Sequence, residues 1–160
     1  MEQKIVCFTG HRQIPYDKKV ELMKILEDEI QRQIEDGAVL FRAGGALGFD
    51  TVAALAVLKA RRKHPHIRLE LILPCPTQSQ NWATADIELY EKILKKADQL
   101  HYVSDSYYNG VLQLRNNQLV DGADVCIAYL KTSYGGSAYT SARAIRMGLE
   151  FINLAERLEN

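Results

Sequence analysis

One glycine-rich stretch of the chain reads Gly44-Gly45-Ala46-Leu47-Gly48-Phe49-Asp50. It lies between the apolar run 38–41 and an alanine- and leucine-rich helical pattern over 51–59. This order predicts a strand, a glycine turn and the start of a helix. Glycine permits positive φ and a close approach to the backbone, and the free amides of a helix start attract anions. Two interpretations follow: the loop binds a phosphate, or it is a tight turn that binds nothing.

Further apolar runs and amphipathic patterns alternate along the rest of the chain. Strands and helices that alternate through short turns favour a parallel sheet. We therefore predict the α/β class: a single Rossmann-like, doubly wound domain over residues 1–160, with a mainly parallel sheet of five or more strands and helices on both faces. The strand 5–8 is expected at its centre. Strands are predicted at 5–8, 39–41, 69–73, 100–103 and 125–130, with an edge strand at 151–154, and helices at 20–34, 51–59, 83–97, 112–120 and 141–148.

Composition limits the classes of function. The 160 residues are 47% hydrophobic and 25% charged, enough for one buried core. Lys and Arg number 20, as do Asp and Glu, so no basic excess supports binding to nucleic acid, and we expect DNA not to be a partner. The three cysteines form no Cys-x-x-Cys pair, which favours a reducing cytoplasm. Residues 1–9 contain no long apolar region, so neither export nor membrane insertion is expected.

Two more loops are expected at the same edge of the sheet. The first strand ends in Gly10-His11-Arg12, which presents an imidazole and a guanidinium. The fifth strand leads into a second glycine loop, 132–140, where the hydroxyls of Ser137 and Thr140 and the free amides of a helix start suit a phosphate. Because the carboxyl ends of parallel strands meet at one edge, the three loops together predict a pocket for a nucleotide or a phosphate.

Some polar and aromatic residues outside the glycine positions have two interpretations each. Trp82 either stacks on a base or anchors the core, and Tyr139 is suited to packing on a sugar or base. Arg115 and Asn116 lie within a predicted helix, where asparagine is a poor helix former, so they are either exposed or in contact with a polar ligand.

With these loops identified, the chain resembles the SLOG superfamily, which includes the DNA-processing protein DprA/Smf and the Lonely Guy phosphoribohydrolases. More narrowly it resembles the small bacterial YpsA-like proteins. The resemblance covers nearly the whole chain and implies a nucleotide-derived ligand related to NAD or ADP-ribose, either sensed or hydrolysed at a glycosidic bond. It is carried, in order, by Phe8-Thr9-Gly10-His11-Arg12, 44–50, Arg115-Asn116-Asn117 and 135–140.

The chain departs from the Lonely Guy enzymes at the second glycine loop. Those enzymes have a catalytic glutamate three residues after the threonine of the loop, whereas here Thr140 is followed at that spacing by Arg143. An arginine can hold a phosphate but cannot act as a general acid or base. Asp50 is then the remaining carboxylate in a glycine loop, and it either caps a helix or acts on the ribose.

Three functions remain open on this basis. The leading one is a sensor or regulatory module that binds a nucleotide. The alternatives are a nucleotide N-glycosidase similar to the phosphoribohydrolases, and a module that binds single-stranded nucleic acid or a protein. No metal is expected, no cofactor is expected beyond a nucleotide, and a homo-oligomer is compatible with the sequence. The predicted site residues are Gly10, His11, Arg12, Gly44, Gly45, Gly48, Arg115, Asn116, Gly135, Gly136, Ser137, Thr140 and Arg143 for the ligand, Trp82 and Tyr139 for base stacking, and Asp50 for catalysis.

Overall fold

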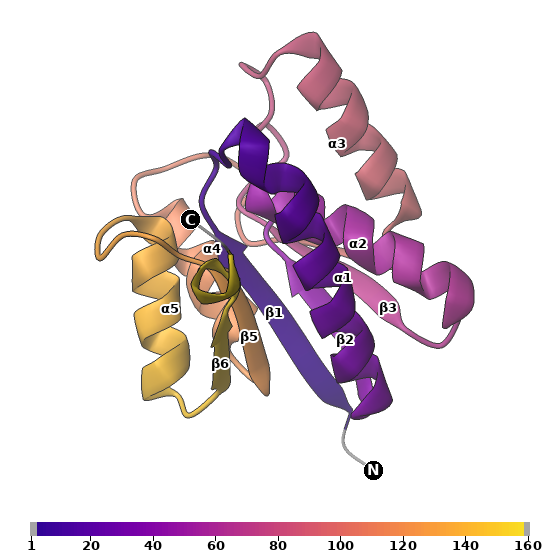
Figure 1. The fold of residues 1–160 in the computed structure, drawn as a ribbon. Coiled ribbons are helices and arrows are strands. Elements are labelled where there is room, and N and C mark those ends of the chain that lie inside the picture. The colour runs from indigo at the N-terminus through magenta and orange to yellow at the C-terminus, as the bar shows by residue number, and fades with distance from the viewer. Residues whose placement is uncertain (1–2, 159–160) are drawn as a thin grey trace.

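A six-stranded sheet forms the centre of the protein in the computed structural model, which describes residues 3–158 (Figure 1). The strand order is β4-β3-β2-β1-β5-β6, and every neighbouring pair is parallel. The predicted α/β class and the central place of the first strand are confirmed. The strands are β1 (Lys4–Gly10), β2 (Ala38–Ala43), β3 (Arg68–Leu73), β4 (Gln99–Tyr102), β5 (Val125–Tyr129) and β6 (Glu150–Asn153).

Helices cover both faces of the sheet, as predicted for a doubly wound fold. The first three helices and the last short helix pack on the face that carries Phe8, and the other two pack on the face that carries Cys7 (Figure 1). The α-helices are α1 (Lys19–Glu35), α2 (Phe49–Lys63), α3 (Thr84–Lys96), α4 (Val111–Val120) and α5 (Gly136–Arg146), with 3₁₀ turns at η1 (Tyr16–Lys18) and η2 (Leu154–Arg157).

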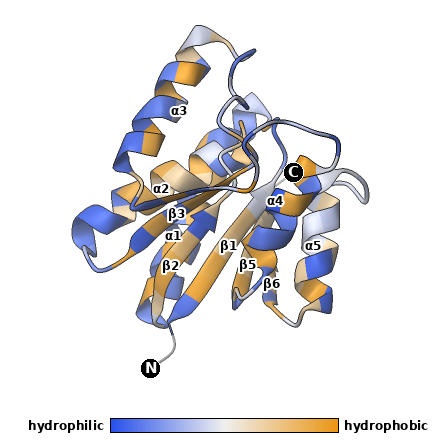
Figure 2. Cartoon of the chain, turned by 180° about the vertical axis from the view of Figure 1, so that it is seen from behind, coloured by the Kyte–Doolittle hydropathy of each residue, from blue (hydrophilic) through white to orange (hydrophobic). Residues whose placement is uncertain are grey.

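The apolar runs of the sequence explain which strands are central. Val6, Cys7 and Phe8 of β1 are fully buried, because the strand has a neighbour on each side and helices above and below. Such strands are apolar on both faces, in contrast to the alternation of a half-exposed strand. Figure 2 shows the strands coloured mainly as hydrophobic, whereas the helices carry both hydrophilic and hydrophobic residues. The edge strand β4 is exposed throughout.

The order of the strands locates the functional edge. The chain proceeds outward from β1 through β2 and β3 to β4, and then returns to place β5 on the other side of β1. In such sheets ligands bind beyond the carboxyl ends of the strands, where this reversal leaves a crevice. The loops that follow β1, β2 and β5 are the three that carry the predicted site. Residues 3–158 include no helix with the length and apolarity needed to span a membrane. The predicted domain extent, 1–160, includes four terminal residues outside this described part.

Candidate anion-binding site

A cavity of about 370 Å³ lies at the carboxyl edge between β1 and β5. Its volume is within the range of small-molecule sites. The three predicted loops all contribute to its lining, together with α4 and the loop after β3. The lining residues are Thr9, Gly10, His11, Arg12, Ala46, Asp50, Gln78, Leu112, Arg115, Asn116, Leu119, Tyr134, Gly135, Gly136 and Ser137.

The first glycine loop is packed against protein rather than open to the cavity. A Cβ on Gly45 would collide with the Leu73 side chain, and one on Gly48 would collide with the backbone carbonyl of Arg12. Both glycines also have positive φ, 73° and 81°, which disfavours any residue with a Cβ. Gly45 was expected to line the pocket and hold a phosphate. In the structure, the side of Gly45 on which a Cβ would lie instead faces Leu73 in the core. The glycines of this loop are required for close packing, and the loop contributes Ala46 and Asp50 to the lining.

The same loop holds a buried carboxylate next to a buried arginine. Asp50, in the first turn of α2, and Arg115, on α4, are each 6% exposed. Gly44 separates them: a Cβ there would lie 2.9 Å from both Asp50 Oδ2 and Arg115 Nη1. Arg115 donates through Nη1 to the Gly44 carbonyl and through Nε to Asn116 Oδ1 at 2.7 Å. The arginine is therefore fixed by neutral acceptors, and within residues 3–158 no carboxylate oxygen lies within 4 Å of its nitrogens.

Burial governs the protonation of Asp50. Its Oδ2 accepts a hydrogen bond from the Ala46 amide at 3.2 Å. Removal from water raises the pKa of Asp50 from 3.8 to about 6, while Arg115, the Ala46 amide and Arg12 act in the opposite direction. Burial likewise lowers the pKa of Arg115. A carboxyl group with this pKa can be neutral in mildly acidic solution, and the two arginines then leave the cavity strongly positive.

His11 connects the two glycine loops. Its carbonyl accepts a hydrogen bond from the Phe49 amide at 3.0 Å, at the start of α2. Its Nε2 accepts from the Lys131 amide at 2.8 Å, at the start of the second loop. Burial and the nearby Lys131 charge lower the pKa of His11 below 6.5, so the ring is neutral at pH 7. Because Nε2 is an acceptor, the neutral ring carries its hydrogen on Nδ1.

The second glycine loop is open, in contrast to the first. No atom lies within 4 Å of the position that a Cβ on Gly135 would occupy, and one on Gly136 would lie 3.6 Å from Asn116 Nδ2. The helix that follows begins at Gly136, five residues earlier than the predicted start at 141. The first amides of a helix have no partner within it. The early start therefore brings the free amides of α5 to the glycines that line the cavity.

Besides Gly44, Gly45 and Gly48, four more of the predicted contact residues lie outside the cavity lining. Thr140 is fully buried, and its hydroxyl donates to the Gly136 carbonyl at 2.9 Å. The Tyr139 hydroxyl donates to Asn117 Oδ1 at 2.9 Å, and Arg143 forms an ion pair with Asp121 at 2.7 Å. Trp82 packs edge-on against Tyr90, with ring centroids 5.1 Å apart, which favours the core interpretation. None of the four lines the cavity.

Six contributors to the lining were not among the predicted site residues: Thr9, Ala46, Gln78, Leu112, Leu119 and Tyr134. Gln78 donates to the Gly45 carbonyl at 3.2 Å and to the Tyr90 hydroxyl at 2.8 Å, so it anchors the first glycine loop. Its position in the polar loop after the third strand was the available signal. Leu112 is in the first turn of α4, and Tyr134 directly precedes Gly135. The adjacency of Tyr134 to the glycines could have identified it, whereas no pattern distinguishes Leu112.

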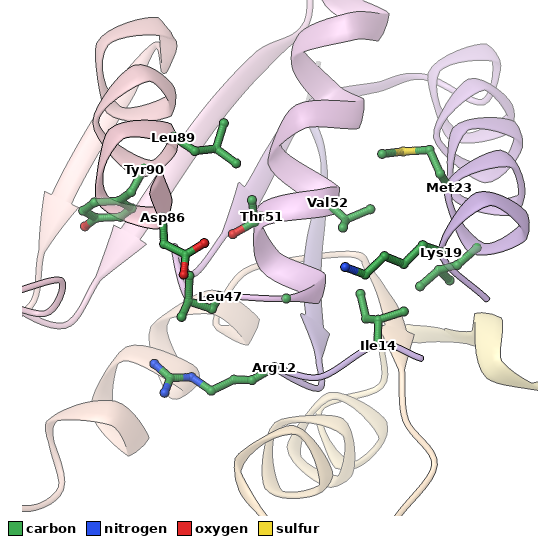
Figure 3. A pocket seen from close by; sticks show the side chains of 12 residues that line it. Arg12, Ile14, Lys19, Met23, Leu47, Thr51, Val52, Asp86, Leu89 and Tyr90 are labelled. Carbon is green, nitrogen blue, oxygen red and sulfur yellow. The ribbon is translucent and has the colours of Figure 1, made fainter. Parts of the chain in front are cut away.

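A second cavity of about 400 Å³ lies on the other side of the first glycine loop, among α1, α2 and α3 (Figure 3). Its walls are mostly apolar, with Met23, Val52 and Leu89 from the three helices, and Lys19 and Asp86 contribute opposite charges. Arg12 lines both cavities. In Figure 3 its guanidinium extends below Leu47, away from the apolar walls.

The fold and this site define a Rossmann-like domain with a polar cavity at the switch point of its sheet. Residues 6–150 match the family described as the YspA SLOG family (YpsA), and the chain belongs to that family. It is 34% identical over 133 residues to a UPF0398 protein of Halalkalibacterium halodurans, covering 81% of this chain and 68% of that protein. It is 32% identical over 127 residues to a UPF0398 protein of Shouchella clausii, covering 77% and 68%. The predicted family resemblance is confirmed.

Two solved structures of DNA processing protein A have the same fold. The Streptococcus pneumoniae protein superposes with a TM-score of 0.66 at 17% identity, over 93% of this chain and 49% of that one. The Helicobacter pylori protein gives 0.65 at 19% identity, over 92% and 63%, and binds single-stranded DNA. This chain thus spans about half to two thirds of these proteins. The expectation that DNA is not a partner is wrong, because the H. pylori protein of this fold binds single-stranded DNA. The expectation rested on the zero net charge of the whole chain, which does not describe the local charge of Arg12 and Arg115 at the cavity.

Proposed function

We propose that the protein binds a nucleotide-derived ligand of the NAD, ADP-ribose or nucleoside-phosphate type and acts as a sensor or regulatory module. The observation that carries this proposal is the buried Arg115, which lines the cavity together with Arg12 and the open start of α5. Its hydrogen bonds go to neutral acceptors rather than to a carboxylate, which leaves the guanidinium able to hold an anion. The phosphate lies between these two arginines and the free amides that begin at Gly136.

The charge balance of the cavity supports an anionic ligand. Arg12 and Arg115 supply two positive charges, His11 is neutral at pH 7, and Asp50 is the one carboxylate in the lining. The lining is therefore positive whether Asp50 is ionised or protonated. Asn116 adds an amide beside Gly136 that can hydrogen-bond a phosphate oxygen.

A calorimetric titration with matched arginine variants tests the proposal. The ligands are ADP-ribose, NAD, AMP and a 5′-phosphorylated oligodeoxythymidylate, the last because the H. pylori protein of this fold binds single-stranded DNA. Arg12→Gln should weaken binding about tenfold to a hundredfold, the scale of one lost charge-assisted hydrogen bond. Arg143→Gln is the control, because that arginine pairs with Asp121 outside the cavity. Equal losses in both variants, or no binding of any ligand by the wild type, would refute the proposal.

A glycosidase is the second candidate, and one observation favours it. Asp50 lines the cavity and has a pKa of about 6, which is suited to a general acid near neutral pH. Its hydrogen bond from the Ala46 amide agrees equally with a structural role at the start of α2. Arg143 also stands where the related hydrolases have their glutamate. The sensor function, in which the ligand is bound and not hydrolysed, therefore agrees with more of the site's residues than the glycosidase does.

Measuring the release of free base by chromatography distinguishes the glycosidase from the sensor function. A catalytic Asp50 predicts that Asp50→Asn retains AMP binding but releases adenine at least about a hundredfold more slowly than the wild type. The sensor function predicts that the wild type itself releases no adenine from AMP and no nicotinamide from NAD above the buffer control. Robust wild-type turnover that Asp50→Asn abolishes would make the glycosidase the correct function.

A further inference from the structure

Two exposed apolar side chains line the cavity between β1 and β5 that contains Arg12 and Arg115. Leu112 is 43% exposed and Tyr134 is 75% exposed, and both line it. The part of an apolar side chain that remains in water contributes nothing to folding through burial. A ligand that covers them would gain that burial on binding. The pair therefore points to a ligand with an apolar part as well as an anionic one.

The two side chains come from different elements of the lining. Leu112 is on α4, three residues before Arg115 and four before Asn116, so all three lie on one helix face. One helical turn rises about 5.4 Å, a length comparable to the ribose that joins a phosphate to its base. Tyr134 is in the loop between β5 and α5, two residues before Gly136. Each apolar residue thus lies next to a group that faces the anion.

The backbone around Tyr134 is held in place. The Thr132 hydroxyl donates to the Tyr134 carbonyl at 2.9 Å, and Gly135, with φ of 94°, follows as the residue that caps α5. The side chain itself has two rotatable torsions, so little conformational freedom is lost when it meets a flat ring. Aromatic side chains that stack on bases typically contribute about tenfold or more to affinity, with little dependence on which base is present.

We propose that Tyr134 and Leu112 form a clamp for the base of the bound nucleotide. The clamp selects base-bearing ligands over sugar phosphates that carry the same anionic group. This inference rests on the proposed function, because the phosphate must first be held by Arg12, Arg115 and the start of α5. Trp82 and Tyr139, the two aromatic residues expected to stack on a base, lie outside the cavity, and Tyr134 takes that role.

The affinities for AMP and for ribose 5-phosphate, measured by calorimetry, test the clamp. The two ligands share the phosphate and the ribose and differ in the base. The wild type should bind AMP at least about tenfold more tightly. Tyr134→Ala should remove most of that preference and leave ribose 5-phosphate unchanged, while Tyr134→Phe should retain it. Leu112→Gln should reduce the preference in the same direction.

A surface tyrosine provides the matched control. Tyr107 is 60% exposed, in the loop between β4 and α4, and lines none of the cavities described here. Tyr107→Ala should leave both affinities unchanged. If the wild type binds both ligands with equal affinity, or if Tyr134→Ala and Tyr107→Ala have the same effect, the clamp is refuted and the anion site stands. If the wild type binds neither ligand nor NAD, the clamp and the proposed function fail together.

Discussion

The two glycine loops have similar sequences and different structural roles. In the first loop, side chains added at Gly45 or Gly48 would strike Leu73 or the Arg12 backbone. In the second loop, a Cβ added at Gly135 would meet open space. One added at Gly136 would have only Asn116 Nδ2 near it, at 3.6 Å. The first loop therefore orients Asp50 and supports Arg115, whereas the second leaves room for a ligand. A glycine-rich turn is required by packing in one case and available for binding in the other.

The largest effect is expected at Gly48. Gly48→Ala places a Cβ against the Arg12 carbonyl at a positive φ, and neither backbone segment can move without disturbing β1 or α2. We expect a loss of about 4 kcal/mol in the free energy of unfolding, at the upper end for single substitutions. Urea denaturation followed by circular dichroism measures it. Gly135→Ala provides the comparison, because its φ is also positive but its surroundings are empty, and it should cost only about 2 kcal/mol from backbone strain. Similar losses in the two variants would show that backbone strain alone, and not packing, distinguishes the loops.

Asp50 gives the next largest effect. Its pKa is raised from 3.8 to about 6 in the folded state, so ionisation is less favourable there than in the unfolded chain. Stability from this group is present below pH 3.8 and is lost as the pH rises to about 6. That difference corresponds to about 3 kcal/mol, and Asp50→Asn, which keeps the acceptor for the Ala46 amide, should be more stable than the wild type at pH 8 by up to this amount. Denaturation at pH 4 and pH 8 tests the sign: a variant less stable at pH 8 would contradict it.

Features that depend on neighbouring residues in the sequence could be predicted, whereas contacts between distant residues could not. Strand and helix order followed from apolar runs such as 5–8 and 125–130, because a strand buried on both faces must be apolar along its length. The role of Gly45 could not be predicted in this way, because the side chain that blocks it, Leu73, belongs to another strand. Arg143 was likewise assigned to a ligand, and Trp82 was left open between a base and the core. Their partners in the structure, Asp121 and Tyr90, are distant in the sequence or could not be identified from it.

The third prediction concerns Gly136 and compares binding with stability. A side chain at this position points towards the Asn116 amide and the space assigned to the anion, and its φ is not positive. Gly136→Val should weaken AMP binding by about a hundredfold, equivalent to about 2.7 kcal/mol, while the melting temperature changes by only a few degrees. Gly45→Val is the matched variant in the packed loop, and there binding and melting temperature should fall together. A parallel loss of both properties in Gly136→Val would assign the second loop to packing as well.

The smallest effect is expected at His11, the residue that connects the two loops. Its Nε2 accepts the Lys131 amide at 2.8 Å, and protonation would replace this acceptor with a donor. Because burial and Lys131 lower its pKa below 6.5, the unfolded chain takes up the proton first, and the stability from this group is lost as the pH falls below 6.5. His11→Gln keeps an acceptor that does not titrate, so its stability at pH 8 should be within about 1 kcal/mol of the wild type. Between pH 7 and pH 5.5 the variant should gain stability relative to the wild type, as thermal denaturation in matched buffers would measure. A constant difference across this range would show that the imidazole does not control the connection between the loops.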